Sequence, residues 1–249
     1  MPFLLAVVAS PCKAQSAFPP AEQLGRGIVA LPASSGQGQF VSWRFLGTDA
    51  AATTFDLLRD GIVIANDLQS VTNYTDPEGT ANSQYQVRAK LNGQVVGTSA
   101  TITPWTNIYR TLRLDRPGNI YTPNDCSVGD VDGDGEYELV VKWDPSTAKD
   151  NSQSGKTDNV YIDCYRLDGT RLWRIDLGCN IRAGAHYTQF LVYDFDGDGR
   201  AELICKTAPG SRDAQNRYVS EAAAEADILN ASDNATDYRN SSGYVLSGP

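Results

Sequence analysis

Short segments in which apolar and polar residues alternate, or in which β-branched and aromatic residues cluster, recur through residues 24–104. These strand-like segments lie at residues 40–45, 54–59, 85–91 and 95–102. Asp60–Gly61 follows the second segment and Asn92–Gly93 follows the third, and both dipeptides are strong signals for tight hairpin turns. Short strands at this spacing predict an all-β sandwich over residues 22–104.

The rest of the chain contains an internal repeat. Residues 128–142 align without gaps with residues 192–206, and each copy places an acidic loop between two strand-like segments. Two further strand-like segments, residues 159–167 and 171–177, lie between the copies and are joined by the turn signal Asp168–Gly169. One repeat therefore holds about four antiparallel strands, as one blade of a β-propeller does.

The repeat region is too short for a whole propeller. Propellers usually have four to eight blades, and about one and a half blades fit between residues 105 and 249. We therefore expect an incomplete propeller over residues 105–249 and interpret the chain as the N-terminal part of a longer protein. A small array of strands that is not a propeller is the alternative. Residues 220–230 are rich in Ala and Glu and predict a short surface helix within the second blade.

Carboxylates recur at alternate positions of each acidic loop. In the first copy they are Asp130, Asp132, Asp134 and Glu138, with the backbone carbonyl of Glu136 as a further ligand. In the second copy they are Asp194, Asp196, Asp198 and Glu202, with the backbone carbonyl of Arg200. Calcium prefers six to eight oxygen ligands in a flexible cage, and alternate residues of a tight loop can point inward together. Because the pattern occurs twice in register, we predict Ca²⁺ sites that are mainly structural; acidic surface turns without an ion are the alternative.

Charge and the N-terminal residues narrow the class of protein. A net charge of −9 argues against nucleic-acid binding, which needs a basic face. No apolar run reaches the roughly 18 residues of a membrane span. The apolar residues 3–9, followed by small residues, predict a signal peptide over residues 1–16 and a secreted or periplasmic protein. Cys164 and Cys205 lie in strand-like segments and are expected to be buried as small apolar residues.

Several long runs of residues carry a resemblance to a known family. The runs are residues 121–146, 149–155 and 180–190, together with 23–30 and 41–44 near the start. They resemble rhamnogalacturonan lyases of polysaccharide lyase family 11, while residues 22–104 also resemble a fibronectin-type-III-like module. The resemblance implies a small β domain followed by an eight-bladed propeller with several calcium ions. It further implies cleavage of the rhamnogalacturonan I backbone of pectin by β-elimination at galacturonate.

The resemblance also points to individual residues. It implies that Asn124 and Asp144 contribute to the cleft that binds the sugar. His186, the only histidine, and Arg182 are candidates for catalysis, since an arginine can pair with a uronate carboxylate. The catalytic base, and the choice between endo- and exo-cleavage, stay unassigned at this point.

The sequence also allows a second function. A non-catalytic calcium-stabilised propeller that binds glycans or proteins is the second reading of the same pattern. The partner expected for the lyase is the pectic polysaccharide rhamnogalacturonan I, and a monomer is expected. Lys142 and Lys206 recur at the same place in the repeat, which predicts a structural role such as pairing with an acidic loop.

Overall fold

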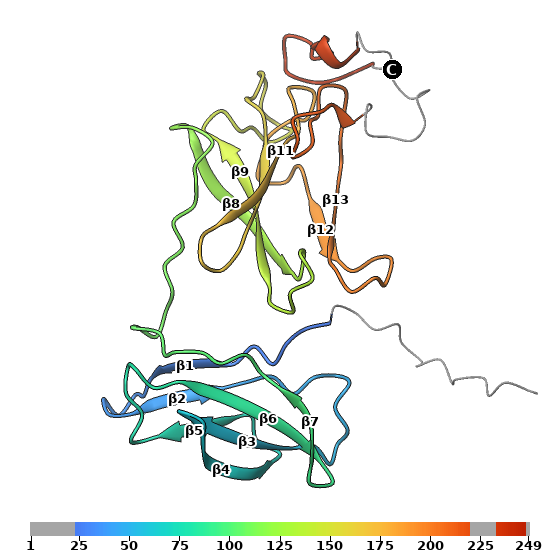
Figure 1. The fold of residues 1–249 in the computed structure, drawn as a ribbon. Helices are drawn as coiled ribbons and strands as arrows, with labels where there is room; N and C mark the ends of the chain where they lie inside the picture. The colour runs from blue at the N-terminus through green and yellow to red at the C-terminus, as the bar shows by residue number, and fades with distance from the viewer. Residues whose placement is uncertain (1–22, 220–232, 248–249) are drawn as a thin grey trace, which may run out of the picture.

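The computed structural model describes residues 23–219 and 233–247, and strands are its main elements (Figure 1). The strands are β1 (Val29–Pro32), β2 (Gln39–Ser42), β3 (Thr54–Arg59), β4 (Ile62–Gln69), β5 (Asn73–Asp76), β6 (Tyr85–Leu91), β7 (Gln94–Thr98), β8 (Tyr121–Gly129), β9 (Glu138–Pro145), β10 (Tyr161–Tyr165), β11 (Arg171–Asp176), β12 (Phe190–Tyr193) and β13 (Glu202–Cys205). The expected all-β class is confirmed for these residues. The signal peptide expected at 1–16 and the helix expected at 220–230 lie outside the described residues.

Strands β1 to β7 form two antiparallel sheets. Their strand orders are β1-β2-β5 and β4-β3-β6-β7. Val41 comes from the first sheet and Phe55 and Leu57 from the second, and all three are buried in one cluster. In β6 the apolar residues at alternate positions are buried, while the polar residues between them are partly exposed. The two sheets therefore meet across one core, as the predicted sandwich requires.

The two turn signals in this part form the hairpins that the sequence predicts. Asp60 and Gly61 have φ angles of 52° and 81°, and Asn92 and Gly93 have φ angles of 51° and 77°. Two consecutive residues with positive φ are typical of the type I′ turn, whose twist matches that of the flanking strands. These turns join β3 to β4 and β6 to β7.

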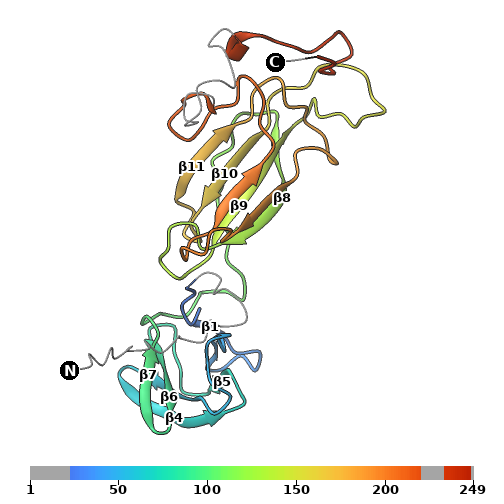
Figure 2. The same ribbon diagram turned by 90° about the vertical axis from the view of Figure 1, so that its right-hand side faces the viewer.

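Strands β8 to β11 form a four-stranded antiparallel sheet in which each strand pairs with the next along the chain (Figure 2). The sheet that one repeat was expected to contain is therefore present. Val140, Ile162 and Cys164 are fully buried on it, which confirms the expected burial of Cys164, whereas Cys205 is only half-buried. Strands β12 and β13 pair with each other, and Phe190 and Leu203 pack against the same core.

No closed ring of sheets forms among the residues that the structure describes. Within the same ranges, no helix has the length and apolar character that crossing a bilayer would need.

Candidate functional site

The first acidic loop joins β8 to β9 and folds around its own first carboxylate. Asp130 is fully buried. Its Oδ1 accepts the backbone N–H of Gly133 at 2.7 Å, and its Oδ2 accepts that of Gly135 at 2.9 Å. Both glycines have positive φ, at 80° and 88°, a conformation that other residues rarely adopt. The spacing of Asp and Gly therefore builds a tight turn with its carboxylate inside.

Three carboxylates converge in this loop. Asp130, Asp132 and Glu138 each place one oxygen within 4.8 Å of the others. Glu138 is 2% exposed, and burial, together with the negative charge of Asp132, raises its pKa above the ordinary value, although a hydrogen bond from the N–H of Val131 opposes this. Arg166 donates from Nε to Asp132 Oδ2 at 2.9 Å and offsets part of the repulsion. The cluster holds more negative charge than its neighbours neutralise.

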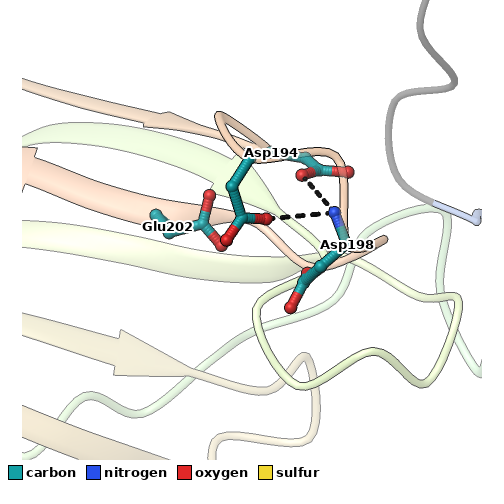
Figure 3. Close-up of side chains that lie close together, drawn as sticks. Asp194, Asp198 and Glu202 are labelled. Atoms are coloured by element: carbon teal, nitrogen blue, oxygen red, sulfur yellow. Dashed lines mark hydrogen bonds between the residues drawn. The ribbon is translucent and has the colours of Figure 1, made fainter.

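The second acidic loop joins β12 to β13 and repeats the arrangement. Asp194, Asp196, Asp198 and Glu202 each bring an oxygen within 4.8 Å of the others. Asp194 is buried, and its Oδ1 accepts the N–H of Asp198 at 3.1 Å (Figure 3). All four carboxylates that the sequence singled out are therefore gathered here. In the first loop the carboxylate of Asp134 lies outside the group and instead accepts the N–H of Glu136 at 2.9 Å.

Glu136 and Arg200, which occupy equivalent places in the two loops, have side chains outside the two carboxylate groups. Glu136 and Arg200 were expected to contribute only a backbone carbonyl. A Cβ on Gly25 would stand 3.3 Å from Oε1 of Glu136, so this side chain lies beside the N-terminal segment. Arg200 contacts Gly133 of the first loop, and the N–H of Ala201 donates to the carbonyl of Asp130 at 2.7 Å. The two acidic loops are therefore direct neighbours.

The donor set of these loops decides which cation fits them. Both groups supply carboxylate oxygen alone, and no His or Cys belongs to either. Hard divalent cations such as Ca²⁺ take oxygen ligands, whereas structural zinc sites use Cys and His. The buried, incompletely neutralised carboxylate of Glu138 fits a site that a cation completes. The residues present are therefore suited to calcium.

The N-terminal segment is attached to the first acidic loop. The N–H of Gly25 donates to the carbonyl of Gly135 at 2.6 Å. The guanidinium of Arg44 lies 4.9 Å from the ring centre of Tyr137 and also donates to the carbonyl of Gly25 at 3.2 Å. Contacts of this kind join the sandwich to the same turn that carries the carboxylates.

The two residues implied in sugar binding lie near one end of the β8–β9 pair. Asn124 is exposed on β8, and Asp144 on β9 is 8% exposed and pairs in register with Thr122. Oδ1 of Asp144 is buried and has no hydrogen-bond partner among the described residues. Burial raises the pKa of Asp144, and the positive charge of Lys142 acts in the opposite direction. The structure thus places an exposed amide and an unsatisfied carboxylate on adjacent strands.

The two candidates for catalysis differ in how free their side chains are. The guanidinium of Arg182 donates to backbone carbonyls of Lys149, Asp150, Gln153, Gly155 and Gly243. It also lies 4.6 Å from the ring centre of Tyr244. Its donors are committed to holding loops together, which favours a structural role. His186 is 82% exposed, and its Nδ1 lies 3.1 Å from Oδ1 of Asp150.

The partner of Lys142 differs from the sequence expectation. Its Nζ pairs with Oδ2 of Asp125 at 2.6 Å and donates to the carbonyl of Tyr187 at 3.2 Å, not to an acidic loop. The corresponding Lys206 of the second copy is exposed. Sequence reasoning missed Asp125 because its position opposite Lys142 depends on an irregularity in strand pairing. One sign was visible in the sequence, because the two copies differ here: Asp125 of the first copy corresponds to Gln189 of the second.

Comparison with known proteins gives the same family over both parts of the chain. Residues 113–249 match the family described as "Rhamnogalacturonan lyase family 11, C-terminal domain". Residues 19–105 match the family described as "Rhamnogalacturonan I lyases beta-sheet domain".

Curated relatives and solved structures agree with these matches. The chain is 50% identical to the rhamnogalacturonan endolyase YesW of Bacillus subtilis (strain 168) over 96% of its length, and 48% identical to the exolyase YesX of the same organism over 92%. It spans 38% and 37% of those two proteins. The solved rhamnogalacturonan lyase of Bacillus licheniformis superposes with a TM-score of 0.82 at 48% identity, covering 92% of this chain and 38% of that one. The match over residues 113–249 alone covers more than half of the chain, so the chain belongs to rhamnogalacturonan lyase family 11.

Proposed function

We propose that this chain is part of an enzyme that cleaves the rhamnogalacturonan I backbone of pectin by β-elimination at galacturonate. One observation carries the proposal: about 50% identity across nearly the whole chain to a protein named as a rhamnogalacturonan endolyase. The match covers 96% of the chain and so includes both parts. The chain spans little more than a third of that relative, so the activity belongs to the complete protein.

The chemistry of elimination defines what the site must provide. A base takes the proton from C5 of galacturonate, the electron pair forms the C4–C5 double bond, and the C4–O bond breaks with protonation of the departing oxygen. Neutralising the galacturonate carboxylate makes the C5 proton more acidic. Asn124 and Asp144 are proposed to contact the sugar, and the unpartnered Oδ1 of Asp144 is an acceptor available to a sugar hydroxyl. No base is assigned among the described residues.

We further infer that residues 105–249 contribute the first blades of a β-propeller. The four-stranded antiparallel sheet β8–β11 is what a blade needs, and the β12–β13 pair packs face to face against it. On β12 and β13 the apolar residues Leu191, Tyr193 and Ile204 are about half exposed or more. An apolar sheet face of this kind is suited to a following blade.

Calcium is proposed to hold the turns of these blades. Asp130, Asp132 and Glu138 would supply the first site, and Asp194, Asp196, Asp198 and Glu202 the second. When bound, the ion neutralises the clustered charge and stabilises the strand turn. The sandwich of residues 22–104, with three strands on one sheet and four on the other, fits a fibronectin-type-III-like module. Export from the cell and a monomeric state complete the proposal.

The decisive test is cleavage of rhamnogalacturonan I by the product of the full gene. The unsaturated uronate formed by β-elimination absorbs in the ultraviolet, so we expect absorbance to rise with time in the presence of Ca²⁺. Polygalacturonic acid, which lacks the alternating rhamnose, is the matched control substrate. Saturating binding of rhamnogalacturonan I without any rise in absorbance would reject the lyase in favour of a non-catalytic glycan-binding propeller.

A further inference from the structure

Strand β8 contains a bulge at the residue implied in sugar binding. Pro123 pairs with Trp143 and Cys126 pairs with Val141, so the two residues Asn124 and Asp125 lie opposite the single residue Lys142. An extra residue of this kind bends its strand and redirects a side chain, and bulges are enriched beside active sites. The direction of Asn124 therefore depends on what holds the bulge in place.

The ammonium group opposite the bulge is unusual because it is fully buried. Lys142 is 0% exposed, and its Nζ reaches Oδ2 of Asp125 at 2.6 Å. A buried charge costs free energy unless it is paired, so the ammonium group of Lys142 depends on its contact with Asp125. The second copy of the repeat lacks this pair, since Lys206 is exposed and Gln189 stands where the first copy has Asp125.

The same ammonium group also holds the loop before β12. Its Nζ donates to the carbonyl of Tyr187 at 3.2 Å, directly after the exposed His186. The next residue, Thr188, has a φ angle of 60°, which is strained for a β-branched side chain. Strain of this kind persists only where the surroundings enforce it, and it clusters at functional sites. Lys142 is thus the common contact of the bulge and of this strained loop.

We propose that Lys142 is a positioning residue for the sugar-binding cleft, in which it fixes the Asn124–Asp125 bulge through Asp125 and the His186–Thr188 loop through the Tyr187 carbonyl. This inference rests on the proposed lyase function and names a residue that contacts no sugar itself. Asp144 lies two residues from Lys142 on the same face of β9. Strand β9 therefore carries the unsatisfied carboxylate of Asp144 and also the lysine that positions Asn124 on β8. Loss of the Lys142 ammonium group would leave the sheet intact but would no longer fix the side-chain amide of Asn124.

The experiment compares Lys142→Met, Asp125→Asn and the double variant in the full gene product, with Lys206→Met as the matched control. We expect each single variant to raise KM for rhamnogalacturonan I about tenfold while kcat stays within about twofold, because the lost contacts bind substrate and transition state alike. A merely structural role would reduce the amount of active enzyme and lower kcat at unchanged KM. The double variant should be no worse than Lys142→Met, since Asp125 is proposed to act only through its contact with Lys142.

Amide hydrogen exchange provides a second measurement that does not need activity. We expect about tenfold faster exchange at residues 122–127 in both Lys142→Met and Asp125→Asn, and at residues 186–189 in Lys142→Met only, with unchanged exchange in Lys206→Met. Asp125 is largely exposed, so its variant remains informative if the lysine variant fails to fold. An unchanged KM in Asp125→Asn, or an equal effect in the control, would overturn the inference. If the wild-type protein does not cleave the polysaccharide, the proposed function fails, and unchanged exchange would then reject the positioning role separately.

Discussion

Replacing Glu138 with glutamine removes one negative charge from the first acidic loop while nearly keeping the size and shape of the side chain. The side chain keeps an oxygen that can accept the N–H of Val131, which Glu138 accepts at 2.8 Å. It loses a negative charge that lies within 4.8 Å of oxygens of Asp130 and Asp132. At an effective dielectric constant of about 20, each such pair repels by roughly 3.5 kcal/mol. Backbone donors, Arg166 and salt offset much of this, so we expect a net stabilisation of the metal-free protein by about 1–2 kcal/mol.

The pH dependence of this effect has a definite sign. Burial raises the pKa of Glu138 above its ordinary value of 4.5. The folded metal-free state therefore binds more protons than the unfolded state just above that pH, and stability falls as the pH rises through the raised pKa. Glu138→Gln removes this loss, so the melting temperature of the metal-free variant should exceed that of the wild type by a few degrees at pH 7 and by less at pH 4.

The same substitution should abolish the response of this loop to calcium. The assay is thermal melting of chelator-treated protein with and without CaCl2, in an Asp194→Asn background so that only the first loop responds. Glu136→Gln is the matched control, because Glu136 is expected to offer only its backbone carbonyl and should keep the calcium response. A lower melting temperature for metal-free Glu138→Gln, or a full calcium response in that variant, would refute the electrostatic reasoning.

Three further predictions concern other parts of the chain. Burial raises the pKa of Cys164 to about 12, so iodoacetamide at pH 8 should leave it unmodified until urea unfolds the protein, as mass spectrometry would show. Asp163→Asn leaves the partly buried Arg174 without its carboxylate and should lower the free energy of unfolding by about 3–5 kcal/mol in urea titrations. Arg44→Ala removes the contact with Tyr137 and should speed limited proteolysis between the sandwich and the repeat region. An unchanged cleavage rate would argue against this attachment.

Local patterns predicted several strands and turns because their causes are local, although they gave no segment for β1, β4 or β5. The β6 strand occupies residues 85–91 as the alternation predicted, and Asn92–Gly93 forms the expected turn because it accepts positive φ. The carboxylates of the second loop also converge as expected, since alternate residues in a tight turn face the same side.

Contacts between distant segments were less accessible to sequence reasoning. The pairing of Lys142 with Asp125 requires the bulge in β8, which no local pattern announces. The role of Arg182 requires that carbonyls from two separate loops meet around its guanidinium. The buried carboxylate of Asp163 accepts hydrogen bonds from Trp143 and Tyr165, and its isolated place in a strand-like segment gave no sign of them. Each of these depends on packing between strands.

Calorimetric titration of the chelator-treated chain with CaCl2 tests the central claim, that the two acidic loops hold calcium. We predict two bound ions in these loops, of which Asp130→Asn removes one and Asp194→Asn removes the other, because each buried aspartate organises its own loop. A titration without binding heat, or an ion count that neither substitution changes, would contradict it.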